Sequence, residues 1–334
     1  MTSPSTGTTG TGPSTGTRKG PESRIRPDPG DGVAAPRERW TVAVLGPGGV
    51  GGLVAALLVR AGHRVIVVAR EETADAIGER GLWVSSALHG EFEVAVEAVT
   101  ELREPVDALV VATKETGLVA ALERVAPAAL EKTPLLPLLN GVEHPRVLRE
   151  RCPSAYVVPG TIRVESTRTE TGRIEHTSPF ARIELAGRDT PPERVAALAS
   201  LLEGAGFETV VRTDETRMLW SKLSFLLPMA LLTTRYGLPV GGVRTERREE
   251  MLAVIGELVA VATAAGAPLD RDGILAVIDA APYGMRSSMQ RDAEAGRPLE
   301  LDAIGGAALR EAARHGIAAP VTARLVEEVE RAAD

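Results

Sequence analysis

The chain has 334 residues, of which 44% are hydrophobic, 25% charged and 3% aromatic, and its formal net charge is −7. This length and apolar content suffice for two domains with buried cores and exclude a fibrous or largely disordered chain. The acidic balance and the few aromatic rings argue against a nucleic-acid-binding protein, which needs clustered Lys and Arg or base-stacking side chains. The sequence has neither an uncharged apolar run long enough to span a bilayer nor an apolar N-terminal stretch, so we expect a cytoplasmic protein without membrane association.

Residues 1–38 consist mainly of Thr, Ser, Gly and Pro with scattered charges. Such a segment cannot bury enough apolar surface to offset the entropy of ordering, so we expect a disordered tail. The basic residues within it have mixed-charge neighbours, and a solvated linker explains them better than a nucleic-acid site.

From Thr41 onward the composition predicts a buried parallel sheet. Residues 41–45 form a short β-branched run that ends at the glycine-rich segment 46–52. A helical pattern follows over residues 53–61. The apolar runs at 64–70, 108–112 and 135–139 alternate little, as is typical of parallel strands covered by helices on both faces. Three later runs are expected to extend the same sheet, namely 155–158, 182–185 and 208–211.

After residue 212 the strand pattern disappears and helical periodicity takes over. Helices are expected at 216–232, 247–265, 270–280, 302–315 and after Pro320. The fold class is therefore α/β, with a Rossmann-type dinucleotide-binding domain at 39–212 and an all-helical domain at 213–334.

The segment Gly46-Pro47-Gly48-Gly49-Val50-Gly51 has the pattern G-x-G-x-x-G between a strand and a helix. The first glycine permits the tight turn, the second lets the backbone approach a pyrophosphate, and the third allows close packing of helix and strand. Glycine-rich turns also occur for purely steric reasons, but the strand, turn and helix context favours dinucleotide binding.

Arg70 lies at the end of the second strand, where an acidic residue usually binds the ribose hydroxyls and an arginine accepts a 2′-phosphate. We therefore expect NADPH (NADP⁺) as the cofactor. The alternative is that Arg70 pairs with neighbouring Glu71 or Glu72.

Lysine and asparagine are scarce in a chain that is rich in arginine, so each one invites individual scrutiny. Asn140 is the sole asparagine, and the lysines are Lys19, Lys114, Lys132 and Lys222. Lys114 and Asn140 follow predicted strands, at the sheet edge where ligands bind in open α/β folds. Taken singly, they are better explained as a solvated loop lysine and an Asn-Gly turn.

Lys222 lies in a predicted helix that is apolar nearly all round, which indicates burial. Burial of an ammonium lowers its pKa toward the range in which it can donate a proton near neutrality. Snorkelling of the side chain to solvent is the alternative. The single cysteine, Cys152, excludes an intrachain disulfide, and no metal-ligand spacing surrounds it.

The segment from Ser287 to Asp302 combines Ser-Ser-Met-x-x-Asp with Gly-Arg-x-x-Glu-x-Asp. Ser287, Ser288 or Asp302 could serve as helix caps, but Glu300 has no such local role.

Together with the glycine motif, Thr113-Lys114, Asn140-Gly141 and Lys222-Leu223, this segment makes the chain resemble the ketopantoate reductase family (2-dehydropantoate 2-reductase) from Thr41 to the C-terminus. The resemblance implies an active site between a Rossmann domain and a helical domain. It also implies NADPH-dependent reduction of a 2-keto acid, 2-dehydropantoate to pantoate, in pantothenate biosynthesis.

The resemblance assigns a role to each matching residue. It implies that Lys222 is the catalytic proton donor, that Glu300 is the active-site acid, and that Ser288 contacts the substrate carboxylate. Asn140 would lie beside the nicotinamide and the substrate, and Lys114 on the cofactor side.

The chain departs from the family at two positions that face the substrate. Family members carry asparagines where this chain has Leu226 and Ala230. A more apolar pocket would hold the hydroxyl and carboxylate of ketopantoate less well. The substrate is therefore expected to be ketopantoate or another branched or bulkier 2-oxo compound.

One alternative from another class is a non-catalytic NADPH-binding regulatory protein, which the intact Lys222 and Glu300 oppose. The expected partner is a small 2-keto acid rather than nucleic acid or a membrane, and the apolar helices of the second domain could form a homodimer face.

Overall fold

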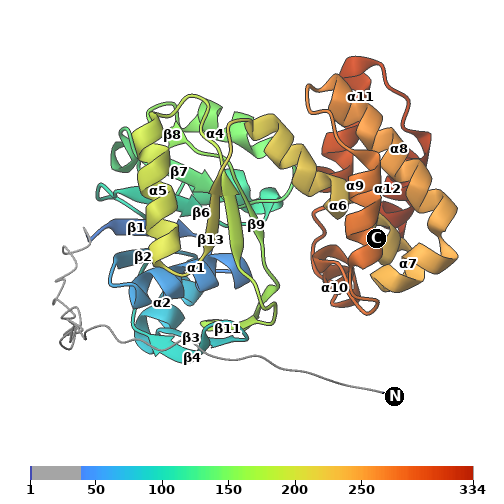
Figure 1. The fold of residues 1–334 in the computed structure, drawn as a ribbon. Helices are drawn as coiled ribbons and strands as arrows, with labels where there is room; N and C mark the ends of the chain where they lie inside the picture. The colour runs from blue at the N-terminus through green and yellow to red at the C-terminus, as the bar shows by residue number, and fades with distance from the viewer. Residues whose placement is uncertain (2–38, 334) are drawn as a thin grey trace, which may run out of the picture. The chain divides into compact units, whose positions relative to one another are not determined.

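The structure, a computed structural model, describes residue 1 and residues 39–333. The predictions for residues 2–38 lie outside the described residues. Within residues 39–333 the strands fall between Thr41 and Val211, and from Glu215 onward the elements are helices (Figure 1).

Six parallel strands form the main sheet in the order β5-β2-β1-β6-β7-β8. They are β1 (Thr41–Leu45), β2 (Arg64–Val68), β5 (Glu97–Val99), β6 (Ala108–Val111), β7 (Pro134–Pro137) and β8 (Tyr156–Val157). The strand order reverses between β1 and β6, which places a ligand crevice beyond the carboxyl ends of these two strands. This is the predicted Rossmann-type arrangement.

Helices cover both faces of the main sheet. They are α1 (Gly49–Arg60), α2 (Glu71–Arg80), α3 (Leu118–Leu122), α4 (His144–Arg151) and α5 (Pro192–Gly204), with short 3₁₀ turns at Glu115–Gly117 and Pro127–Leu130. Side chains alternate along β1, so Val42 and Val44 pack in a core with α1 and α5, whereas Ala43 and Leu45 pack in a second core with α3 and α4. Burial of the strands on both faces explains their continuous apolar runs.

The expectation that residues 182–185 and 208–211 extend the main sheet is wrong. Strands β12 (Arg182–Leu185) and β13 (Glu208–Val211) instead form a separate three-stranded sheet with β9 (Gly160–Arg163). This sheet lies over a face of the main sheet, because a Cβ on Gly160 would be 2.6 Å from Leu136 Cδ1 of β7. Its apolar side chains thereby join the core that α1 and α5 also share.

A third sheet was not anticipated from the sequence. Its order is β10-β11-β3-β4, formed by β10 (Ser166–Glu170), β11 (Arg173–His176), β3 (Leu82–Ser86) and β4 (Gly90–Val94). Strands β4 and β10 are short and largely polar, so they lack the continuous apolar pattern of the main sheet.

The helical region contains two short helices beyond those predicted, α7 and α10. Its elements are α6 (Glu215–Tyr236), α7 (Val240–Glu246), α8 (Arg248–Ala264), α9 (Arg271–Ala280), α10 (Ser288–Glu294), the π-helical η3 (Asp302–Gly306), α11 (Ala307–His315) and α12 (Pro320–Ala333). The π-helical turn interrupts the single helix predicted for 302–315.

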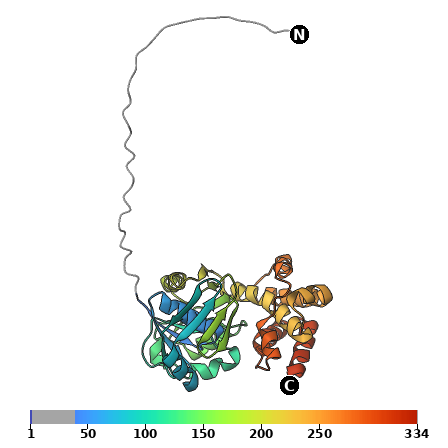
Figure 2. The same cartoon turned by 90° about the horizontal axis from the view of Figure 1, so that it is seen from below.

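Helix α6 connects the two regions (Figures 1 and 2). Asp214 caps its start by accepting a hydrogen bond from Arg217 N (2.9 Å), and Gly237 ends it at a φ of 65°. Near its start Met218 and Leu219 pack against Ala186 after β12, and further along Leu223 and its neighbours enter the helical core. Residues of α6 are thus fixed relative to both regions.

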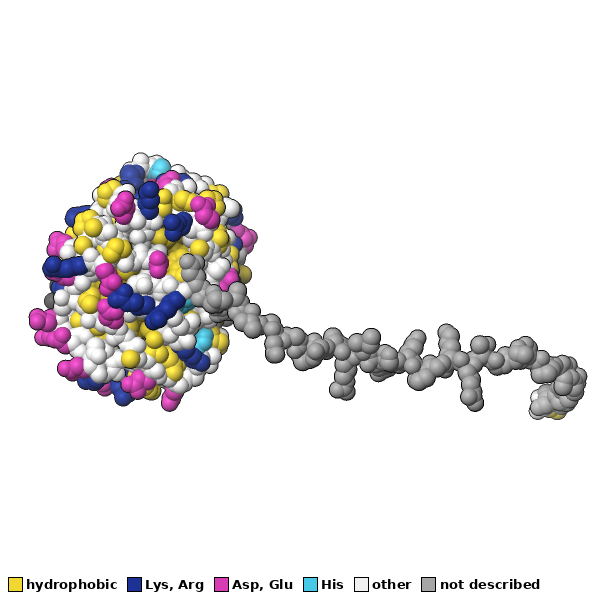
Figure 3. Space-filling view, turned by 90° about the vertical axis from the view of Figure 1, so that its left-hand side faces the viewer, with side chains coloured by type: hydrophobic (Ala, Val, Ile, Leu, Met, Phe, Trp, Pro, Cys, Tyr) yellow, Lys and Arg dark blue, Asp and Glu magenta, His cyan; other side chains and the backbone are white. Residues whose placement is uncertain are grey.

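Among the described helices, none alone is long and apolar enough to cross a membrane; α6 and α7 pass that test as a pair but bend by 84° between them. On the face drawn in Figure 3, Lys and Arg side chains are interspersed with Asp and Glu. That face therefore lacks the continuous positive surface that binds nucleic-acid backbones.

Candidate active site

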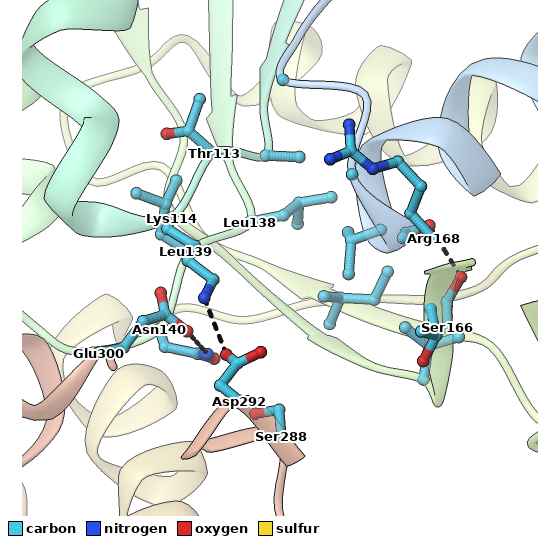
Figure 4. A pocket seen from close by; sticks show the side chains of 18 of the residues that line it. Thr113, Lys114, Leu138, Leu139, Asn140, Ser166, Arg168, Ser288, Asp292 and Glu300 are labelled. Carbon is cyan, nitrogen blue, oxygen red and sulfur yellow. Dashed lines mark hydrogen bonds and ion pairs between the residues drawn. The ribbon is translucent and has the colours of Figure 1, made fainter. Parts of the chain in front are cut away.

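A cavity of about 1210 Å³ lies between the carboxyl ends of the parallel strands and helices α6 and α10. The glycine-rich turn and Arg168 lie on one side of it, and Asn140, Glu300 and Ser288 lie on the other (Figure 4). We refer to the first side as the glycine-turn end. We call the second side the Lys222 end, because Lys222 also lines the cavity and the Glu300 charge acts on it.

The glycine-turn end has the steric features that the motif predicts. Gly46 has a φ of +90°, and a Cβ there would lie 2.8 Å from Thr113 Cγ2. No atom lies within 4 Å of a Cβ built on Gly48, so its backbone is open to the cavity. A Cβ on Gly51 would be 2.2 Å from the Gly46 carbonyl oxygen, so this glycine permits close packing. Residues 46–50 line the cavity, whereas Gly51 lies beneath them.

Strand β10 completes the wall beside this turn, which sequence reasoning missed. The Ser166 hydroxyl donates to the Gly49 carbonyl oxygen (2.7 Å), and a Cβ on Gly49 would be 2.3 Å from the Ser166 carbonyl oxygen. Arg168, two residues later, extends into the cavity (Figure 4). No local motif marks these residues, because their position depends on the pairing of β10 with β11.

Arg70 precedes α2 as its N-cap residue, is exposed, and lines the cavity. Among the described residues no ion pair joins it to Glu71 or Glu72. Its guanidinium donors therefore remain available to an anion in the cavity.

Lys114 lines the cavity but is held by the helical region. Its Nζ lies 2.8 Å from Asp292 Oδ2 and donates to the Pro298 carbonyl oxygen (2.8 Å). These bonds connect the loop after β6 to the segment around α10, across the cavity (Figure 4). Lys114 is thus partly exposed to solvent but is not a free cation.

Asn140 forms a second contact across the cavity. Its Nδ2 donates to Glu300 Oε2 (2.9 Å), and Glu300 Oε1 accepts from the Glu115 backbone N–H (3.4 Å). Gly141 has a φ of +89°, so the Asn-Gly turn predicted as an alternative is also present. The turn and the polar contact are compatible, since the turn directs Asn140 at the buried Glu300 carboxylate.

Lys222 lines the cavity from α6. Burial lowers the pKa of this ammonium to about 8; the nearby Glu300 carboxylate acts in the opposite direction and the Arg163 guanidinium adds to the lowering. Within the described residues Lys222 has no hydrogen-bond partner, so its protons remain available to a ligand.

Of the other residues predicted to contact the substrate, two line the cavity and one does not. Ser287 caps α10 by accepting from Gln290 N (3.0 Å), which leaves the exposed Ser288 facing the cavity. Leu226 lines the cavity, but Ala230 is fully buried in the helical core, and Met229 lies at the cavity instead. The structure therefore does not bring Ala230 to the substrate side of α6.

Two further charged or titratable residues near Lys222 carried no sequence signal. His144, at the start of α4, is buried, and neither ring nitrogen has a well-formed hydrogen bond. Burial and then the Lys222 charge lower the pKa of this imidazole to about 3, while the Asn140 backbone opposes the shift. Arg163, the last residue of β9, is exposed and lines the cavity.

Basic side chains dominate the cavity although the whole chain is acidic. The basic ones are Arg70, Lys114, Arg124, Arg163, Arg168, Lys222, Arg286, Arg291 and Arg297, and the acidic ones are Glu165, Asp292 and Glu300. A cavity lined in this way favours anionic ligands.

Comparison with known proteins agrees with this geometry. The family described as Ketopantoate reductase PanE/ApbA matches residues 42–188, and its C-terminal counterpart matches residues 214–333. A 2-dehydropantoate 2-reductase of Mycobacterium tuberculosis (strain ATCC 25618 / H37Rv) is 31% identical over 312 residues, which cover 88% of this chain and 98% of the relative. The chain belongs to the ketopantoate reductase family.

Two other similar proteins span nearly the same length. The uncharacterized oxidoreductase YkpB of Bacillus subtilis (strain 168) is 30% identical, with 83% of this chain and 94% of the relative covered. The crystal structure of a PanE/ApbA family ketopantoate reductase from Ralstonia eutropha JMP134 has a TM-score of 0.80 and 26% identity, covering 88% of this chain and 98% of that one. The chain is thus an oxidoreductase of this family across both regions.

Proposed function

We propose that this protein reduces a 2-keto acid with NADPH, with 2-dehydropantoate or another branched or bulkier 2-oxo acid as substrate. The observation that carries the proposal is the position of Lys222, a half-buried ammonium with a lowered pKa and free donors, in the same cavity as the glycine-rich turn. A proton donor and a dinucleotide-binding turn that share one cavity fit a reductase.

The residues at the glycine-turn end fit a dinucleotide phosphate. The open backbone at Gly48 would hold the pyrophosphate, and Arg70, which has no acidic partner among the described residues, would hold the 2′-phosphate. Arg168 lines the same part of the cavity and would add a second cation. NADPH supplies the hydride that reduces the C2 carbonyl when it is bound.

The residues at the Lys222 end would handle the oxygen of that carbonyl. Lys222, as ammonium, polarises the oxygen and transfers a proton to it, which leaves a 2-hydroxy acid and a neutral amine that regains its proton from water. Glu300 stabilises the protonated form of Lys222 and is itself held by Asn140. The role of Asn140 is therefore to orient the acid as well as to border the reaction site.

The apolar wall of α6 supports a substrate with an apolar side chain. Phe225, Leu226 and Met229 line the cavity on consecutive turns near Lys222. Such a wall accepts extra methylene groups at little cost but offers no partner to a substrate hydroxyl.

The test is a steady-state assay of the purified full chain with NADPH or NADH and a panel of 2-keto acids that includes 2-dehydropantoate. We expect a higher kcat/KM with NADPH than with NADH, and turnover of at least one branched 2-keto acid. Tight NADPH binding by calorimetry with no oxidation by any keto acid would instead favour a binding protein. Equal kcat/KM for NADPH and NADH would refute the role of Arg70.

A further inference from the structure

Most basic side chains of the cavity already have partners. Lys114 and Arg297 pair with Asp292, Arg286 pairs with Glu294, and Arg124 and Arg291 donate to backbone carbonyls. Three arginines form no hydrogen bond or ion pair with another described residue, namely Arg70, Arg163 and Arg168. An arginine offers five donors in a planar fork that matches carboxylate and phosphate oxygens.

In the proposed function, two of these three arginines face phosphates of the dinucleotide. Arg70 follows the second strand of the Rossmann fold, and Arg168 lies on the strand that packs against the glycine-rich turn. Arg163 lies elsewhere, at the end of β9, which contacts α6. The cofactor phosphates therefore leave Arg163 without an assigned anion.

The carboxylate of Glu184, on which the Arg163 charge acts, is already engaged by other arginines. In the sheet register Arg163 is opposite Arg182 of β12, and Glu184 lies on the same face of that strand. Glu184 accepts from Arg212 (3.0 Å) and pairs with Arg182 (3.2 Å), so it attracts Arg163 only from beyond ion-pair distance. The Arg163 guanidinium consequently remains free on the cavity side.

Arg163 and Lys222 are two cations at the same end of the cavity, and each is close enough for its charge to act on the other. The carboxylate and the C2 carbonyl of a 2-keto acid are joined by one bond. A residue that binds the carboxylate must therefore lie near the residue that polarises the carbonyl. Arg163 meets this requirement, and an anion between the two cations would offset their mutual repulsion.

We propose that Arg163 supplies the charged partner of the substrate carboxylate, beside the Ser288 hydroxyl to which the family resemblance gives a contact with that group, and that the wall of Phe225, Leu226 and Met229 holds an apolar substrate side chain. The preferred substrate class is then a 2-keto acid with a branched or bulky apolar side chain. This inference rests on the proposed reductase function, but carboxylate binding can be measured without turnover.

The experiment compares 4-methyl-2-oxopentanoate with its primary amide, which has the same shape and no charge. Binding of each to the full chain with NADP⁺ is measured by calorimetry, and KM and kcat are measured with NADPH. The variants are Arg163→Met and Arg163→Lys, with Arg182→Met as a matched control, because Arg182 is the cross-strand neighbour and does not line the cavity.

We expect Arg163→Met to raise the Kd and KM for the acid about 30-fold, as loss of a charge-assisted bidentate contact would. The KM for the amide should change less than threefold, and the Kd for NADPH should stay the same. Arg163→Lys should recover part of the loss, since a lysine keeps the charge but not the fork. Arg182→Met should leave the KM for both compounds unchanged.

The pH dependence of kcat/KM is a second measurement, and it would not change if Arg163 had a purely structural role. The charged and titratable groups that face Lys222 are Arg163 from β9, Glu300 from the loop before η3 and His144 from α4. Since Arg163 lowers the pKa of Lys222, its removal should shift the alkaline fall of kcat/KM from near pH 8 to higher pH. The Arg182→Met profile should match that of the wild type.

Two results would overturn the inference: an acid Kd within threefold of wild type in Arg163→Met, or equal weakening of acid and amide. A wild-type chain that neither binds nor reduces the acid would overturn both this inference and the proposed function. Binding of the acid without turnover, lost in Arg163→Met, would support the carboxylate site and refute only the reductase function.

Discussion

The glycine-turn end and the Lys222 end of the cavity are built in different ways. The first is made mainly from the backbone of one continuous stretch, residues 46–50, supported from below by Gly51. The second is assembled from side chains on separate segments, with Asn140 after β7, Lys222 on α6, and Ser288 and Glu300 around α10. In the proposed function, the backbone that would bind the cofactor therefore comes mainly from one local stretch, with Arg168 added by β10, whereas the groups that would react with the substrate are brought together by tertiary packing. Substrate preference could then change without loss of the glycine-rich turn.

The largest expected effect comes from removing Lys222, the proposed proton donor. Lys222→Ala should lower kcat about 10³-fold, the range of general acid catalysis, while the Kd for NADPH measured by calorimetry stays unchanged. Ser221→Ala, next to it on α6 but outside the cavity, is the control and should keep its activity. Wild-type turnover by Lys222→Ala would contradict the assigned mechanism.

At the glycine-turn end, the effect of adding a methyl group should depend on whether the glycine lies beneath the turn or faces the cavity. Gly51→Ala should lower the free energy of unfolding by about 3 kcal/mol, because its Cβ would lie 2.2 Å from the Gly46 carbonyl oxygen and overpack the turn. Gly48→Ala has open space around its Cβ and should fold with wild-type stability but bind NADPH more weakly. Urea unfolding of both variants checks this contrast; equal stability of the two would show that Gly51 does not support the turn.

Arg70 tests cofactor preference separately from the chemistry. Arg70→Ala should lower kcat/KM for NADPH about 30-fold and leave kcat/KM for NADH nearly unchanged, because only the former has a 2′-phosphate. Steady-state kinetics with both cofactors and one keto acid measure the ratio. Parallel losses with both cofactors would place Arg70 in a structural role.

The smallest effect concerns stability near the Lys222 end. Since burial lowers the pKa of His144 from 6.5 to about 3, the unfolded chain binds a proton below pH 6.5 that the folded chain does not. Stability should therefore fall with decreasing pH, and His144 should account for about 1.4 kcal/mol of that fall by pH 5.5. His144→Met should show a correspondingly smaller loss in urea unfolding between pH 7.5 and pH 5.5. An identical loss in both proteins would mean that the imidazole is not held neutral.

The sequence predicts those elements of the fold that have a pattern within one continuous segment. Five of the six strands of the main sheet, the glycine-rich turn and the long helices of the second region follow from continuous apolar runs, a fixed motif and helical periodicity. The edge strand β5 was missed, because it has only three residues. The small sheets were missed or misassigned because their strands are short, partly polar and packed on a face rather than an edge.

The candidate site could be predicted only where a residue belongs to a recognisable segment. Lys114 was identified, but its pairing with Asp292, 178 residues away, has no local signature. Arg163, Arg168 and His144 have no local sequence signature either, since their surroundings depend on which strands and helices pack together. The family resemblance placed Ala230 at the cavity with Leu226, but in the structure Met229 lines the cavity and Ala230 is buried in the helical core.

The continuity of α6 from Glu215 to Tyr236 restricts where this chain can gain or lose residues. One residue inserted between Asp214 and Lys222 would rotate the ammonium by about 100° around the helix axis and turn it out of the cavity. The same insertion after Gly237, where the helix has ended, would leave Lys222 in place. Length variation compatible with activity is thus confined to the stretches outside this helix.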